Sequence, residues 1–349
     1  MNLTIEQIAN GLTTEHEMFF PEQPENPEMR ESTSIWLFEE NGEFGFPRIG
    51  IEGEAHSWDN RYYSANFGLG EGRVLRDGNR GGVPSPFDAQ GRAAVFGAGP
   101  LRFQCLEPFK RWRVSYDGTA ADGTTDQQIA GTVDETKRAA LKFDAELTMV
   151  TPCWVQDNSA EKVAKMSKAA AEEATSMGIG WRLEHMFRGE GTLTVDGKTR
   201  DFKAVGSRIK RQSIRPLNFF RGHCWQSAVF PDGSAFGYIA YPSTSDGTPP
   251  YNDGYIFKDG KMYPAKAINK PWLTKIVADG DDVSVELESE LGITRISGTT
   301  AFSSFHIMDT ENSRFNLNQS GACYSWDGQT AYGMIERSAT DEQMASWSK

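Results

Sequence analysis

The sequence is poor in cysteine, in basic charge and in long apolar runs, and each shortage removes a class of protein. Its 349 residues include 4 Cys, which form no C-x-x-C pair, so a zinc ribbon is excluded. Acidic residues outnumber Lys and Arg by 48 to 36, and the formal net charge of −12 makes nucleic acid an unexpected partner. No stretch approaches about 20 uncharged apolar residues, so no membrane-spanning helix is expected.

The cysteines and the first residues of the chain predict a cytoplasmic protein. Cys105, Cys153, Cys224 and Cys323 are widely spaced and lie beside apolar or aromatic residues. Reduced, buried thiols are expected, and a disulfide or a nucleophile is the alternative. The N-terminus has no basic segment followed by an apolar run, so no secretory signal is expected. Metal-ligand spacings and phosphate-loop motifs are missing, so neither a metal nor a cofactor is expected.

Turn signals and alternating runs predict a mainly β protein. The dipeptide Asp-Gly, which suits tight hairpins, occurs ten times, from Asp77-Gly78 to Asp327-Gly328. Polar and apolar residues alternate over 110–116, 192–195 and 282–287, as they do in half-buried strands. Many short strands joined by hairpins indicate a sandwich or a barrel.

Helical signals are few and suggest how the chain divides. The segment 160–174 is rich in helix formers, with Asn158 as its expected cap and Gly178 near its end. A short helix is expected at 4–9, and the proline-rich stretch 20–27 should be an extended surface arm. We therefore expect an N-terminal arm (1–30), a β domain (31–157), a helical connector (158–180) and a second β domain (181–349).

Several segments, taken in order, resemble the carotenoid 1,2-hydratase (hydroxyneurosporene synthase)/AttH-like superfamily. The resemblance covers most of the chain from about residue 31, and the order and spacing of the segments carry it. The segments are Glu31–Phe38, Phe46–Ile51, Glu107–Arg113, Arg182–His185, Gly191–Gly197, Gly206–Arg208 and Tyr332–Arg337.

The resemblance implies two tandem lipocalin-like antiparallel β-barrels or sandwiches, with one short helix between or beside them. Relatives of this kind act on hydrophobic, often prenylated or polycyclic substrates without a redox cofactor. One motif departs from the family: many members carry Asp and His after the Arg that matches Arg208, where this chain has Ile209 and Lys210. An activity that depends on that His–Asp pair would be lost or moved here.

Adding water to an alkene, or cyclising it, calls for an acid in a dry pocket and for aromatic faces that stabilise positive charge. A buried carboxyl group stays protonated at neutral pH and could supply the acid. We therefore singled out carboxylates and histidines among aromatic residues. The candidate catalytic residues are Glu184, Asp59 and His223, and the candidate ligand-binding residues are His56, Trp58, Tyr62, His185, Arg208 and Trp225.

The first of three clusters covers residues 54–63. On a strand, His56, Trp58 and Tyr62 would share one face, and Asp59 and Arg61 the other. The cluster is either a ligand wall or a surface ion pair beside core aromatics.

The second cluster, 181–187, places His185 on an apolar face and Glu184 on the opposite face. His185 is either a core histidine or a pocket acid–base. Glu184 is either the acid or a partner of Arg208 that joins two strands.

The third cluster, 219–226, puts His223 and Trp225 on one strand face, which suits a flat apolar ligand or an ordinary core. The basic run 208–215 is either a solvated face or an anion site, such as one for a carboxylate or a coenzyme A phosphate.

Two functions from different classes follow from these features, and a third is weaker. The first is a cofactor-independent hydratase, isomerase or cyclase for a hydrophobic terpenoid, steroid or polyketide-like substrate. The second is a non-catalytic carrier of such molecules, and the third is an interaction protein without a ligand cavity. A homodimer is a possible assembly.

Overall fold

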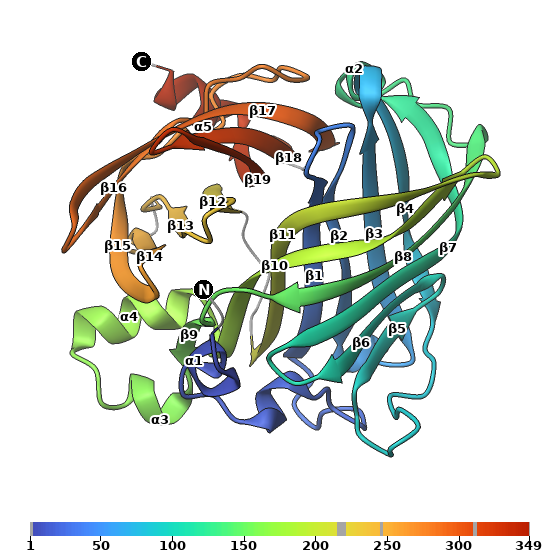
Figure 1. Cartoon of the computed structure of the whole chain (residues 1–349). Helices are drawn as coiled ribbons and strands as arrows, with labels where there is room; N and C mark the ends of the chain where they lie inside the picture. Colours follow the sequence, from blue (N-terminus) through green and yellow to red (C-terminus); the bar gives the residue numbers. More distant parts are fainter. Residues whose placement is uncertain (1–2, 215–220, 245–246, 310–312, 349) are drawn as a thin grey trace.

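The computed structural model describes residues 3–214, 221–244, 247–309 and 313–348. Its strands form two β units that lie side by side, an N-terminal one in blue to yellow and a C-terminal one in orange to red (Figure 1). The expected mainly β class and the tandem arrangement are confirmed.

The N-terminal unit is an eleven-stranded antiparallel sheet in the order β4-β3-β2-β1-β11-β10-β8-β7-β6-β5, with β9 paired to β10. A further pairing of β4 with β7 curls the sheet round a core. Its strands are β1 (Met29–Glu39), β2 (Phe44–Glu54), β3 (Asn60–Leu69), β4 (Arg73–Gly82), β5 (Val95–Ala98), β6 (Leu101–Glu107), β7 (Arg111–Thr124), β8 (Arg138–Met149), β9 (Trp154–Asn158), β10 (Ile179–Val195) and β11 (Lys198–Ile214).

The C-terminal unit is a closed antiparallel barrel in which each strand pairs with the next along the chain and β19 closes on β12. Its strands are β12 (His223–Val229), β13 (Ala235–Tyr241), β14 (Tyr251–Lys258), β15 (Lys261–Asn269), β16 (Val285–Ser289), β17 (Gly292–Asp309), β18 (Arg314–Trp326) and β19 (Gln329–Thr340).

The strand pairing corrects the expected domain boundary at residue 181. The β10–β11 hairpin lies inside the N-terminal sheet, where β11 pairs with β1 and β10 pairs with β8. Residues 179–214 therefore belong to the first unit, and the closed barrel begins at β12. The boundary was misplaced because the helical connector was interpreted as the end of the first domain. The strands that follow the connector, β10 and β11, instead pair between β8 and β1 of the first sheet.

Only some of the Asp-Gly dipeptides form the expected turns. Positive φ angles at both residues mark tight hairpins at Asp196-Gly197, Asp259-Gly260 and Asp327-Gly328. Four others lie inside strands: Asp77-Gly78 in β4, Asp117-Gly118 and Asp122-Gly123 in β7, and Asp253-Gly254 in β14. At Gly254 a Cβ would lie 2.6 Å from the carbonyl oxygen of Gly237, so a glycine serves close strand packing there. Asp246 lies outside the described residues.

The helices are short and lie at the ends of the sheets. They are α1 (Ile5–Ala9), α2 (Thr125–Ala130), α3 (Ala160–Val163), α4 (Lys168–Ser176) and α5 (Asp341–Trp347), with 3₁₀ turns η1 (Thr14–Glu17), η2 (Ala55–Ser57) and η3 (Gly70–Gly72). The expected opening helix is confirmed.

The single helix expected over 160–174 is instead two helices, α3 and α4. Ser167 caps the second one by accepting a hydrogen bond from the amide of Ala170, and such a cap begins a new helix. Asn158 caps neither helix, because its side chain bonds the carbonyl of Ala174.

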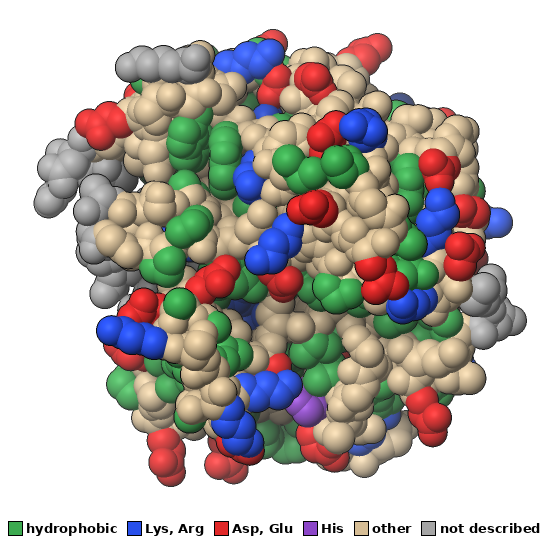
Figure 2. Space-filling view, turned by 90° about the vertical axis from the view of Figure 1, so that its left-hand side faces the viewer, with side chains coloured by type: hydrophobic (Ala, Val, Ile, Leu, Met, Phe, Trp, Pro, Cys, Tyr) green, Lys and Arg blue, Asp and Glu red, His purple; other side chains and the backbone are tan. Residues whose placement is uncertain are grey.

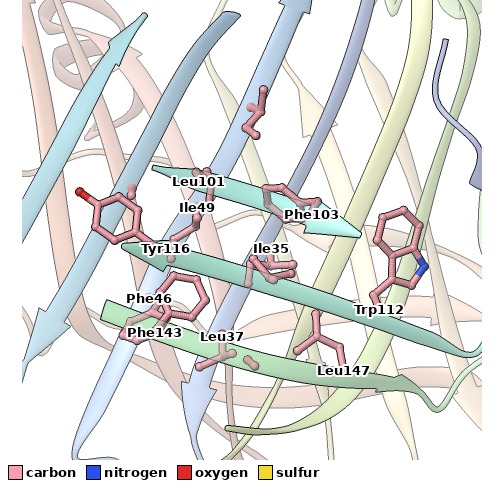
Figure 3. Close-up of a cluster of buried hydrophobic side chains, with 14 of the residues drawn as sticks. Ile35, Leu37, Phe46, Ile49, Leu101, Phe103, Trp112, Tyr116, Phe143 and Leu147 are labelled. Carbon is pink, nitrogen blue, oxygen red and sulfur yellow. The ribbon is translucent and has the colours of Figure 1, made fainter. Parts of the chain in front are cut away.

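Side chains fill the interior of the N-terminal unit, as Figure 3 shows. Phe46 from β2 reaches across to Phe143 from β8, with their ring centroids 5.3 Å apart. The closed barrel has its own core of buried residues, among them Phe236 and Tyr324. A third apolar cluster, which includes Trp36, Phe38 and Trp225, joins the two units. Side chains therefore pack the interior of both units.

The N-terminal arm closes one end of the first unit. Ile8, Ala9 and Phe19 join its core, while the proline-rich stretch 20–27 is largely exposed, as expected. Glu17 and Arg208 are both fully buried and form an ion pair. The carboxylate of Glu17 also accepts a hydrogen bond from Nε1 of Trp112 at 2.7 Å. Burial is the largest single influence and would raise the pKa of Glu17. The charges of Arg208 and His185, together with the hydrogen bonds from Trp112 and Arg208, outweigh burial and hold that pKa below its usual range.

Gly206 on β11 allows a close approach of the neighbouring strand. A Cβ there would lie 1.9 Å from the carbonyl oxygen of Trp36. We expect G206A to lower the free energy of unfolding by about 1–3 kcal/mol through overpacking. The matched control is G82A, whose Cβ would meet nothing within 4 Å. Urea unfolding followed by tryptophan fluorescence measures both, and equal losses in the two variants would contradict the prediction.

The expectation of reduced, largely buried thiols agrees with the structure, and one face of the surface carries charges of both signs. On the face in Figure 2, acidic and basic side chains are interspersed with apolar ones. All four cysteines are free, and three are buried. Within the described part of the chain, no helix has the length and apolar character needed to cross a bilayer.

Candidate functional site

A cleft of about 470 Å³ lies between the two β units. Its floor is the outer face of β1 and β11, and its opposite wall is formed by β12, β13, β18 and β19. Side chains alternate between the two faces of a strand, and this alternation creates the cleft surface. Ser32, Ser34 and Trp36 of β1 line the cleft, while Ile35 and Leu37 point to the core of the first unit.

His223 is the central titratable group of the cleft. Its Nε2 lies 3.0 Å from Oε1 of Glu336, and its Nδ1 lies 2.6 Å from Oγ of Ser338. The register explains the contacts, because His223 pairs directly with Ser338 and Trp225 pairs with Glu336. The ring also stacks on Tyr241, with centroids 5.6 Å apart.

Glu336 is held as a carboxylate. Burial alone would raise its pKa, but the hydrogen bond and charge of His223, together with Arg48, lower the pKa of Glu336 below its usual range. Nε2 of Gln319 also donates to Oε2 of Glu336 at 2.6 Å. Because an ionised carboxylate only accepts, Nε2 of His223 donates to Glu336. In the neutral imidazole Nδ1 then accepts from the Ser338 hydroxyl, and in the imidazolium it donates to that oxygen.

Arg48 reaches the cleft from an irregular part of β2. The register of β2 against β3 shifts between Gly45 and Ile49, and Arg48 has a φ of 71°, a left-handed conformation that non-glycine residues rarely adopt. The side chain donates to Glu52 at 2.7 Å and lies 3.9 Å from Oε2 of Glu336. The bulge thus directs a fixed positive charge toward the carboxylate that holds His223.

Glu184 lies one layer behind the cleft. Its Oε2 accepts from Arg182 at 2.8 Å and from Nε1 of Trp225 at 3.1 Å, and both of these partners line the cleft. Burial is the largest influence on the pKa of Glu184 and raises it, although Arg182 opposes this. Glu184 therefore positions two lining residues and does not itself border the cleft.

A family model described as "Domain of unknown function (DUF7064)" matches residues 13–340. The chain belongs to this DUF7064 family. No curated protein shows a significant match to the sequence.

Solved structures share the fold of this DUF7064 chain. A Nitrosomonas europaea protein assigned as AttH superposes with a TM-score of 0.54 and 14% identity, over 90% of this chain and 92% of that one. CghA, solved with Sch210972, superposes with a TM-score of 0.57 and 10% sequence identity, over 90% of this chain and 89% of CghA. Kievitone hydratase from Nectria haematococca has 12% sequence identity, over 93% of this chain and 94% of that one. Its TM-score of 0.47 is too low to support an argument. The first two confirm the fold that the resemblance to AttH-like proteins implied.

The structure places three of the nine predicted site residues on the cleft of the DUF7064 chain. These are His223, Trp225 and Tyr62. The first cluster is not a continuous strand, because β2 ends at Glu54 and the turn η2 follows. Asp59 and His56 are exposed as a result, and His56 lies 3.4 Å from Glu54. Trp58 packs in the core of the first unit.

His185 and Arg208 lie inside the first unit, away from the cleft. Nδ1 of His185 is 3.1 Å from Arg208, and its Nε2 is 3.3 Å from the carbonyl of Ile8. Burial and the charge of Arg208 lower the pKa of His185 to about 4. His185 is therefore the core histidine. Of the two alternatives for Glu184, the pair with Arg208 is wrong, because the two side chains point to opposite faces of the sheet.

The basic run is a strand with two different faces. Arg208 and Lys210 are buried in the first unit, where Lys210 lies 3.5 Å from Glu31, while Arg211 faces the cleft. The interpretation of the basic run as a solvated face is therefore wrong. Arg215, and Phe219 and Phe220 of the third cluster, lie outside the described residues.

Sequence reasoning missed four residues of the site: Arg48, Tyr241, Glu336 and Ser338. Arg48 and Glu336 lie in segments that carried the family resemblance, which was the available signal. Their meeting with His223 could not be foreseen, because Glu336 is 113 residues away along the chain. In the described part of the chain, no group of three His, Cys, Asp or Glu side chains could hold a metal ion.

Proposed function

We propose that this protein is a cofactor-independent hydratase, isomerase or cyclase that acts on a hydrophobic terpenoid, steroid or polyketide-like substrate by proton transfer in the cleft. The observation that carries the proposal is the Ser338–His223–Glu336 chain of hydrogen bonds, which reaches the surface of an aromatic-lined cleft. The CghA structure contains a small molecule, which supports ligand binding by this fold in that protein.

His223 is the group that can take up and return a proton. Glu336 orients the imidazole and stabilises the imidazolium that forms, and the Ser338 hydroxyl links Nδ1 to a ligand or to a water molecule. An imidazolium is too weak an acid to protonate an isolated alkene. The imidazole can, however, act as a general base or acid at a carbon beside a carbonyl, or assist the addition of water to a conjugated alkene. We therefore place the reaction at an activated double bond.

The aromatic residues suit the apolar body of such a substrate. Trp36 and Trp225 meet edge to face, with centroids 4.7 Å apart, and Tyr241 lies beside His223. Phe315 and Leu317 extend this surface from β18.

The test is proton exchange. The protein is incubated in D₂O with a panel of conjugated ketones, among them a steroid enone, a cyclic terpenoid enone and a β-keto polyketide mimic, and masses are followed with time. We expect deuterium uptake or a product mass with at least one of them. A change in tryptophan fluorescence on binding, with no exchange and no product for any ligand of the panel, would favour the carrier function instead.

A further inference from the structure

Three arginines from different parts of the chain line the cleft. Arg182 lies on β10, Arg211 on β11 and Arg221 just before β12, and all three line the cleft. The register places Arg182 directly opposite Arg211 on neighbouring strands. Like charges directly opposite on a sheet are destabilising, so this arrangement costs stability.

The contacts of these arginines hold them in place at the wall. Arg182 donates to Glu184 and to Oε1 of Gln156 at 3.1 Å, and it lies 4.6 Å from the ring centroid of Trp225. Arg211 donates to the carbonyl oxygen of Met177 at 3.1 Å. The guanidinium groups are therefore positioned by protein contacts before any ligand arrives, which favours a planar, bidentate partner.

The charge balance of the cleft is opposite to that of the chain. Six arginines and three glutamates line it, in a protein with a net charge of −12. Arg30 and Arg80 pair with Glu54, Arg48 pairs with Glu52, and Arg182 pairs with Glu184 behind the wall. Even with Glu184 included, the arginines outnumber the carboxylates by six to four. An excess of one sign of charge between low-dielectric walls concentrates ligands of the opposite sign. The arginines are Arg30, Arg48, Arg80, Arg182, Arg211 and Arg221, and the glutamates are Glu52, Glu54 and Glu336.

Trp36 supplies a further donor. It lines the cleft and is fully buried, and its Nε1 has no hydrogen-bond acceptor among the residues that the structure describes. A buried N–H without an acceptor costs free energy, and a ligand oxygen would satisfy it.

From these observations we propose that the ligand of the cleft carries an anionic oxygen group, such as a carboxylate or an acidic enol, that binds to Arg182 and Arg211. Its apolar body lies against Trp225 and Tyr241, near His223. The substrate class under "Proposed function" thus becomes an acidic terpenoid, steroid or polyketide-like molecule, and the inference rests on that proposed function for its identification of the substrate.

The test compares two probes with the same aromatic skeleton. 8-Anilinonaphthalene-1-sulfonate is anionic, and N-phenyl-1-naphthylamine is neutral. Titrations follow probe emission and tryptophan quenching. We expect the anionic probe to bind about 10-fold more tightly and R211M to remove that preference, because the variant loses the charge-assisted hydrogen bonds that Arg211 would donate to the probe. Added salt should weaken only the anionic probe.

The matched control is R295M, which removes the same charge from the exposed Arg295 on β17, outside the cleft. R182M/E184Q is a second cleft variant, which avoids leaving Glu184 as a buried carboxylate without its partner. Near-UV circular dichroism confirms that each variant keeps its tertiary structure. Equal affinity for both probes, or equal loss of anionic affinity in R211M and R295M, would overturn the proposal.

The two proposals fail in different ways. If the wild-type protein prefers the anionic probe through Arg211 but never exchanges deuterium with any ligand, the enzyme proposal is wrong and the anion site stands. If the wild type exchanges deuterium into neutral enones and shows no preference between the probes, the anion site is wrong and the enzyme proposal stands.

Discussion

Replacing His223 with glutamine (H223Q) lowers the rate of deuterium exchange by about 10²–10⁴-fold, the usual contribution of a general acid–base group. Glutamine can still donate to Glu336, but it cannot take up and return a proton. The loss should therefore appear in kcat, with KM changed little, because the arginines and aromatic residues that bind the ligand remain. Exchange rates measured by mass spectrometry over a range of substrate concentrations separate the two constants.

The matched control is H306Q, which makes the same change at His306 on β17, beside Arg76 and outside the cleft. This variant should exchange at the wild-type rate. If H223Q keeps the wild-type kcat, then the role of His223 as the proton-transfer group is wrong, even though the cleft would remain a binding site.

Replacing Glu17 with glutamine (E17Q) has the largest expected effect on stability. The exchange leaves Arg208 as a fully buried charge without its carboxylate, and breaking a buried ion pair in this way costs about 3–5 kcal/mol. Urea unfolding at neutral pH, followed by tryptophan fluorescence, measures the loss. The control is E28Q, because Glu28 is exposed on the same arm, and its effect should stay within about 0.5 kcal/mol.

The difference in the free energy of unfolding between the wild type and E17Q should decrease as the pH falls. The pKa of Glu17 is lowered in the folded state, so its contribution is fully present above its unfolded pKa and is lost as the pH falls through the folded value. The two proteins should therefore converge in stability toward acid pH. A gap that widens on acidification would show that Glu17 does not stabilise the fold as a carboxylate.

Removing both partners separates the ion pair from simple packing. The double variant E17Q/R208M removes both buried charges, while the amide oxygen of the introduced glutamine can still accept from Trp112 and Phe109. It should recover most of the stability that E17Q loses. A double variant less stable than E17Q would contradict this account of the network.

The class of the fold could be predicted because its signals are local. Alternation over 110–116 and hairpin dipeptides such as Asp196-Gly197 act over a few residues, and the structure bears them out. The domain boundary could not be predicted in the same way. The boundary depends on the pairing of β1 with β11, in which Arg30 lies opposite Ser213. No sequence pattern near either residue indicates a partner so far along the chain.

The candidate site was predictable where aromatic density marked a strand, as at His223 and Trp225. Prediction failed at Asp59 because a strand was extended through Ala55–Ser57, where the chain turns instead. Glu336 and Ser338 could not be assigned, because their role depends on the closure of β19 onto β12. The site is thus a product of tertiary pairing more than of any single motif.

The insertion of β10 and β11 between β1 and β8 sets an order for assembly during synthesis. Until residue 214 has left the ribosome, the edges of β1 and β8 that these strands will cover have no partner, and open strand edges invite association with other chains. Such distant pairings also slow folding. A nascent chain of this protein therefore has a long interval in which a chaperone that shields strand edges would improve its yield.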